Sequence, residues 1–127
     1  MKEVLLVGIG GFIGSAARYQ LGAAILHMMG QGRFPYGTFV INVVGCGIIG
    51  VLAGLAEQHG FFRPAARLFL FTGLLGGFTT FSAFGLETMF LLRRGELWSA
   101  AAYAGSSVVV GITAVWLGLK LVSMLPR

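Results

Sequence analysis

The chain has 127 residues, of which 57% are hydrophobic and only 10% charged, and its mean hydropathy is +0.89. This composition excludes an ordinary water-soluble domain. The formal net charge of +5 does not indicate a nucleic-acid partner, because the cations stand mainly at the ends of apolar stretches, where lysine and arginine anchor helices to lipid headgroups.

Four apolar stretches are long enough to cross a bilayer, which takes about 20 residues. They cover residues 4–29, 37–56, 68–92 and 97–122, and short polar or charged links separate them. We therefore expect an all-α, multi-pass membrane protein in a cell membrane. Its four transmembrane helices form a single domain over residues 1–127.

In the first stretch, Arg18 lies about 14 residues from the start, which corresponds to about 21 Å of helix rise. An arginine at membrane depth is a functional-site hypothesis. The alternative is that the helix ends early and Arg18 reaches the interface. In both cases Arg18 places positive potential near one mouth of any path, which suits an anion. Gly10 and Gly14 have the four-residue spacing that serves helix packing.

In the second stretch, Asn42 lies about five residues inside the apolar segment, and Thr38 is one turn before it on the same helical face. A buried amide costs several kcal/mol unless it is hydrogen-bonded. Asn42 therefore either bonds a neighbouring helix or donates a hydrogen bond into an aqueous vestibule. Cys46 is predicted to be a small packing residue, and Gly50 and Gly54 repeat the four-residue spacing.

The middle of the third stretch contains glycine and hydroxyl residues, namely Gly76, Gly77, Thr79, Thr80 and Ser82. Each glycine weakens a helix by about 1 kcal/mol. Non-helical backbone at membrane depth persists only where protein or a water-filled cavity satisfies its polar groups. The pattern predicts a third helix that is broken at mid-membrane, which indicates an ion or substrate site.

Phe81 and Phe84 follow the predicted break on one helix face, with Ser82 between them. Two phenylalanines at this spacing are typical of a core, but their positive ring edges are also able to hold a small anion. Glu87 follows about one turn later. It either pairs with Arg18 across helices or lines an entrance.

The fourth stretch carries Tyr103 and Ser107 one turn apart. They form either a hydroxyl track along a pathway or an interfacial tyrosine beside backbone-bonded serines. Trp98 and Trp116 are predicted interface anchors.

The sequence contains no pattern typical of an enzyme. Its histidines, His27 and His59, have no metal-ligand spacing with Cys46, and neither a phosphate-binding loop nor a nucleophile elbow is present.

The cations are almost evenly divided between the two sides of the predicted bundle. Both ends of the chain and the second link share one side, which holds five cations: Lys2, Arg63, Arg67, Lys120 and Arg127. The other side holds three: Arg33, Arg93 and Arg94. Because an excess of cations normally sets orientation, so small a bias favours insertion in both directions and hence an antiparallel dimer.

Taken together, these residues resemble the Fluc/CrcB family of fluoride channels. The matching signature runs from Gly73 through Gly76-Gly77-Phe78-Thr79-Thr80-Phe81-Ser82-Ala83-Phe84 to Glu87-Thr88. Pro35-Tyr36-Gly37-Thr38 leading to Asn42, and Gly14-Ser15-Ala16-Ala17-Arg18-Tyr19, extend it. The match covers three of the four spans in the family's order, and the fourth matches loosely through Tyr103.

The resemblance implies an antiparallel, dual-topology homodimer in the bacterial inner membrane with two fluoride pores. It implies a structural sodium ion at the dimer centre, held by backbone carbonyls of Gly76 and Thr79. The implied fluoride pathway contains Asn42, Phe81, Phe84, Thr38, Ser82, Tyr103, Ser107, Arg18 and Glu87. Relatives commonly carry threonine at Ala83, and some carry serine at Gly111, so two hydroxyls are missing here.

Two other readings compete with passive fluoride export. A small multidrug-resistance-type proton-coupled transporter is also short and four-spanning, but it needs a membrane-embedded glutamate in its first helix. This first stretch has only Glu3, at its edge, and a cation at depth. A non-transporting assembly subunit would explain the glycines but not the polar break.

Overall fold

The computed structural model describes residues 1–126, and its regular secondary structure is entirely helical. Four helices are long and apolar enough to cross a membrane. They are α1 (Lys2–Met29), α2 (Tyr36–Gln58), a third helix spanning Pro64–Arg93, and α6 (Leu97–Ser123). Each of these four helices covers one of the four apolar stretches predicted from the sequence. Arg127, one of the cations in the predicted charge balance, lies outside the described residues.

The links between the helices are short and carry clear stop and start signals. Gly95 adopts φ 75° in the turn between the third helix and α6, a conformation that favours glycine. Pro64 stands at the first position of the third helix, where its missing N–H leaves no helical hydrogen bond unmade.

The third helix is interrupted, as the glycine and threonine cluster predicts. It consists of α3 (Pro64–Arg67), the π-helical segment η1 (Leu68–Leu75), α4 (Gly76–Phe78) and α5 (Phe81–Arg93). Between α4 and α5 the backbone is extended, with ψ 158° at Thr79 and φ −149° at Thr80. The π-helical segment was not predicted from the sequence.

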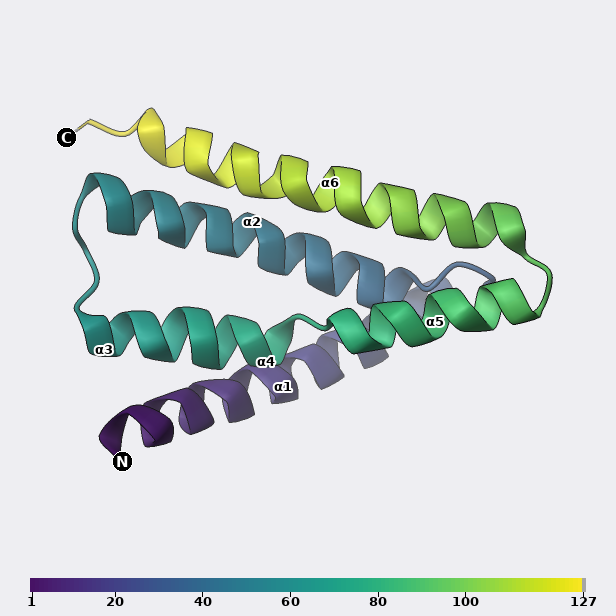
Figure 1. Cartoon of the computed structure of the whole chain (residues 1–127), viewed down its shortest axis with the longest axis horizontal. Helices are drawn as coiled ribbons and strands as arrows, with labels where there is room; N and C mark the ends of the chain where they lie inside the picture. Colours follow the sequence, from purple (N-terminus) through teal and green to yellow (C-terminus); the bar gives the residue numbers. More distant parts are fainter. Residues whose placement is uncertain (127) are drawn as a thin grey trace.

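Figure 1 shows the third helix beside α2, α2 beside α6, and α1 crossing behind the third helix. The two most extensive helix contacts are those of α2 with α6 and of α1 with η1. Both ends of the chain and the α2–α3 link lie at one end of the bundle. This arrangement agrees with the predicted sidedness of four successive spans.

The close contacts in the bundle depend on glycine. Gly10 and Gly14 are buried where α1 meets the third helix, and Gly50 and Gly54 are buried against α6. A Cβ added at Gly14 would overlap the carbonyl oxygen of Leu74. The packing role predicted for both glycine pairs is confirmed.

Candidate functional site: the break in the third helix

The extended backbone at the break is held by one side chain of α2. The Asn42 amide nitrogen donates to the carbonyl oxygen of Thr80 at 3.0 Å, and its amide oxygen accepts the N–H of Thr80 at 2.9 Å. These two bonds replace helical bonds that the break removes. An amide nitrogen has two hydrogens, so Asn42 retains one N–H for another acceptor.

The second half of the third helix begins with a side-chain cap. Thr80 is the N-cap of α5, and its hydroxyl accepts the N–H of Ala83 at 3.3 Å. Thr80 and Ser82 hydroxyl oxygens also lie 3.4 Å apart, where either can donate. The break therefore presents several hydroxyl and amide groups within a few residues.

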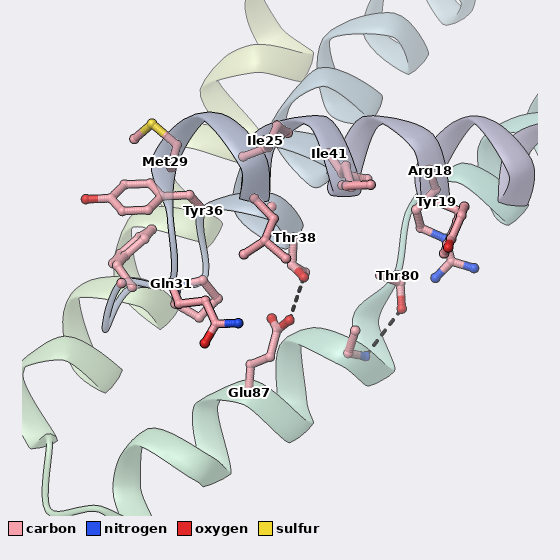
Figure 2. Close-up of a pocket in the computed structure, with 18 of the residues that line it drawn as sticks. Arg18, Tyr19, Ile25, Met29, Gln31, Tyr36, Thr38, Ile41, Thr80 and Glu87 are labelled. Atoms are coloured by element: carbon pink, nitrogen blue, oxygen red, sulfur yellow. Dashed lines mark hydrogen bonds between the residues drawn. The ribbon is translucent and has the colours of Figure 1, made fainter.

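A second polar cluster surrounds Glu87, about two turns after the break. Its Oε1 accepts the Thr38 hydroxyl at 2.7 Å, and its Oε2 accepts the Tyr103 hydroxyl at 2.7 Å. Figure 2 shows the first of these bonds in the centre of a cavity. Of the two alternatives predicted for Glu87, the structure favours a place in a cavity wall, because its hydrogen bonds come from hydroxyls and not from Arg18.

Aromatic rings connect the two clusters. The ring centroids of Phe81 and Phe84 are 5.5 Å apart, and those of Phe84 and Tyr103 are 5.1 Å apart. Tyr103 is fully buried, whereas the Phe81 side chain is 83% exposed. Phe84 is thus fixed by the interior of the subunit, and Phe81 projects from its surface.

The larger cavity has a volume of about 830 Å³ and contains the Glu87 cluster. Arg18, Thr38, Thr80 and Glu87 all line it. In Figure 2, Arg18 lies beside Thr80 at one end, while Gln31 and Tyr36 lie at the opposite end. We call this space the Glu87 cavity.

The smaller cavity has a volume of about 420 Å³ and contains the other side of the break. Several predicted site residues line it: Asn42, Gly76, Thr79, Phe81, Phe84 and Ser107. The Ser107 hydroxyl oxygen is buried and makes no hydrogen bond within residues 1–126. We call this space the Asn42 cavity. Thr80 lines both cavities.

The predicted hydroxyl track of the fourth span is only partly assembled. Ser107 lines the Asn42 cavity, whereas the Tyr103 hydroxyl points to Glu87 and Tyr103 lines neither cavity. The neighbouring Ser106 hydroxyl donates to the Tyr103 carbonyl oxygen at 3.4 Å, as the backbone-bonded alternative requires. Ser82 is exposed and also lines neither cavity.

The backbone at the break also offers free oxygens. The backbone N–H groups that would bond the Gly76 carbonyl in a regular helix donate elsewhere, Thr79 to Leu75 and Thr80 to Asn42. The Ala83 N–H, which would reach the Thr79 carbonyl, donates to the Thr80 hydroxyl. Oxygen atoms of this kind suit a hard cation such as sodium. The described residues contain no group of three His, Cys, Asp or Glu side chains that could hold a metal ion.

Two residues make hydrogen bonds at the site that the sequence does not predict. Thr80 was recognised as part of the polar cluster, but its bonds to Asn42 join residues 38 positions apart. Ser15 donates to the Gly77 carbonyl oxygen at 3.4 Å. For Thr80, the local signal is a threonine directly before the helix that begins at Phe81, a pattern typical of an N-cap residue.

These features define a multi-pass membrane protein whose third helix is interrupted between two polar-lined cavities. Residues 5–119 match the family described as CrcB-like protein, Camphor Resistance (CrcB). The chain belongs to this family.

Curated relatives match nearly the whole chain. A protein of Methylobacillus flagellatus named fluoride-specific ion channel FluC is 56% identical over 124 residues, which cover 98% of this chain and 97% of the relative. Proteins of the same name from Novosphingobium aromaticivorans and Acidobacterium capsulatum are 49% and 46% identical, covering 95% and 92% of this chain and 96% and 93% of their own length.

Proposed function

We propose that this chain is a fluoride-specific ion channel, and not an enzyme, that lets fluoride leave the cytoplasm down its electrochemical gradient and so limits fluoride toxicity. The observation that carries the proposal is family membership over almost the full chain, with a relative of that name at 56% identity. Residues 1–127 act as one channel domain.

The two cavities on either side of Thr80 supply the pathway. Fluoride passes along the wall formed by Arg18, Thr38 and Glu87, and then reaches Asn42 and the phenylalanines. The contact of both cavities with Thr80 supports this order. Tyr103 acts from behind this wall, because its hydroxyl holds Glu87 in place.

Selectivity follows from the groups that replace water around the ion. Fluoride is small and strongly hydrated, so the path must offer several hydrogen-bond donors within a narrow bore. The remaining N–H of Asn42, the hydroxyls of Ser107 and Ser82, and the positive edges of Phe81 and Phe84 supply them. Because Ala83 and Gly111 stand in place of hydroxyl residues, the unpartnered Ser107 hydroxyl supplies a larger share of the hydrogen bonds to fluoride.

In a single copy of the chain, part of the proposed pathway beside the break is exposed. Gly76, Phe81 and Ser82 are exposed beside the break, and lipid cannot satisfy polar backbone there. A second, antiparallel copy of the chain covers this face in our proposal, in agreement with the five-to-three division of cations. A tag at the C-terminus should then be accessible from both sides of the membrane in one population.

The same face supplies a structural sodium site. Gly76 and Thr79 of each copy contribute one carbonyl oxygen, so that four oxygens hold the ion between the subunits. The diversion of the Thr79, Thr80 and Ala83 N–H groups to other acceptors supports this assignment. The ion neutralises the partial charges of the two facing breaks and joins the subunits. Exchange of sodium for a large organic cation should dissociate or inactivate the dimer.

Fluoride efflux from protein-containing liposomes tests the function. Vesicles loaded with potassium fluoride, in the presence of a potassium ionophore, should release fluoride much faster than protein-free vesicles. Vesicles loaded with potassium chloride should not release chloride. Equal release of both anions, or no release of fluoride from vesicles with verified protein content, would overturn the proposal.

A further inference from the structure

The Glu87 cavity contains one cation that the pathway above does not use. Of the residues that line it, only Arg18, Glu87 and Arg94 carry a formal charge. Arg94 is the C-cap residue of α5. It follows Glu87 by seven positions, which corresponds to two helical turns and about 10 Å along the axis.

This spacing puts Arg94 at the end of the cavity remote from the break. Arg18 lies at the other end, beside Thr80 (Figure 2). Gly30, Gln31 and Gly32 of the α1–α2 link also line the cavity and are exposed. The cavity is therefore open to solvent near this link, and Arg94, which is exposed itself, belongs to the same end of the molecule.

We propose that Arg94 is a positioning residue that concentrates fluoride at the solvent mouth of the Glu87 cavity. The proposal rests on the proposed channel function. Without Arg94, an anion entering from this end would meet the Glu87 carboxylate before reaching Arg18. With Arg94 present, the mouth carries positive potential ahead of that carboxylate.

The expected magnitude follows from Coulomb's law. A unit charge about 10 Å from an anion beside Glu87, with an effective dielectric constant of about 40 to 80, changes the local anion concentration about two- to four-fold. An interaction of this kind is screened by salt, because the Debye length falls from about 30 Å at 0.01 M to about 3 Å at 1 M ionic strength.

The neighbouring Arg93 provides a matched control. It is also an exposed arginine at the end of α5, but it does not line the cavity. Arg93→Gln and Arg94→Gln therefore remove the same charge from adjacent positions, but only Arg94 lines the cavity.

The proposal is tested by measuring fluoride flux through the protein in liposomes at about 0.01 M and about 1 M ionic strength. An impermeant salt sets the ionic strength. At low ionic strength we expect Arg94→Gln to reduce the flux about two- to four-fold and Arg94→Glu to reduce it further. Arg94→Lys should conduct like the unaltered protein. At high ionic strength the differences should disappear, and Arg93→Gln should have little effect at either.

Three outcomes would overturn the role of Arg94: unchanged flux in Arg94→Glu at low ionic strength, a loss that persists undiminished at high ionic strength, or an equal loss in Arg93→Gln. The lysine and glutamate variants give a decision even where the glutamine variant folds poorly. Failure of the unaltered protein to conduct fluoride would instead contradict the proposed function, so the two failures are distinguishable.

Discussion

The two halves of the third helix are held in different ways. Before the break, the helix packs against α1 through backbone contacts, and a Cβ added at Gly77 would overlap the Gly11 carbonyl oxygen. After the break, α5 is held by side chains, chiefly the hydroxyls bonded to Glu87 and the ring contact of Phe84 with Tyr103. The first half forms a close-packed support, and the second half borders the larger cavity.

This difference explains where polar groups are tolerated. Backbone-to-backbone packing leaves no room for a pathway, because glycine surfaces approach until the main chains touch. Side-chain packing leaves space between the helices, and polar side chains such as Thr38, Thr80 and Glu87 line that space. Asn42 lies between the close-packed half and the half that borders the larger cavity. Its amide hydrogen-bonds the backbone at the break, and it also lines the smaller cavity.

The largest expected effect comes from disturbing the backbone contact. Gly14→Ala places a methyl group against the Leu74 carbonyl, which cannot move aside without shifting the helix. Overpacking typically costs about 1–3 kcal/mol. We expect a sharp loss of monodisperse protein in size-exclusion chromatography. Gly8→Ala is the control, because its Cβ would meet nothing within 4 Å. Equal yields of the two variants would show that the contact is not tight.

The next largest effect concerns Asn42, which lies between the two halves of the third helix. Asn42→Asp keeps the shape but replaces the N–H donor with a second carboxylate oxygen, which faces the Thr80 carbonyl and repels fluoride. We expect fluoride flux to fall about tenfold or more while the protein stays folded and monodisperse, since a like charge about 4 Å from the anion costs about 1 kcal/mol in bulk water and about 4 kcal/mol near a protein surface. Gln58→Glu makes the same exchange at the exposed end of α2 and should conduct normally. Unaltered flux in Asn42→Asp would show that Asn42 does not donate to the anion and has only a structural role.

The phenylalanine pair distinguishes pathway from packing within the second half. Phe81→Ile and Phe84→Ile keep apolar volume but remove the positive ring edges. We expect a large loss of flux from at least one variant. Only Phe84→Ile should also lower thermal stability, because Phe84 packs on Tyr103 whereas Phe81 is 83% exposed.

The control for the rings is Phe90→Ile, an exposed phenylalanine of α5 that lines neither cavity. If Phe81→Ile and Phe84→Ile both conduct as well as this control, the rings are packing residues and do not coordinate the anion.

The smallest expected effect concerns the bond between Tyr103 and Glu87. Tyr103→Phe removes the hydroxyl that donates to Oε2 of Glu87 and preserves the ring contacts. Glu87 is only half-buried and keeps its bond to Thr38, so the loss of one hydrogen bond costs about 0.5–1.5 kcal/mol, which should appear as a slightly lower thermal midpoint. Tyr19→Phe removes an exposed hydroxyl and should leave the midpoint unchanged. A midpoint for Tyr103→Phe equal to that of Tyr19→Phe would contradict a stabilising role for the bond.

Much of this architecture was predictable because its signals are local. Apolar length gave the four spans, and the run from Gly76 to Ser82 gave the position of the break. Long-range pairings were not predictable, since Thr38 and Glu87 are 49 positions apart, and Asn42 and Thr80 are 38 apart. The sequence left Asn42 open between a structural bond and an anion donor. The structure shows the bond, and anion donation by the remaining N–H stays a prediction. The π-helical segment had no residue signature that would separate it from an α-helix.

The reversal potential of single channels in a planar bilayer tests passive fluoride conduction most directly. With a fluoride gradient across the bilayer and chloride at equal concentration on both sides, a fluoride-selective channel should reverse close to the fluoride equilibrium potential. An added chloride gradient in either direction should leave that potential unchanged. Reversal near zero under the fluoride gradient, or a shift that follows chloride, would contradict selective fluoride conduction by this protein.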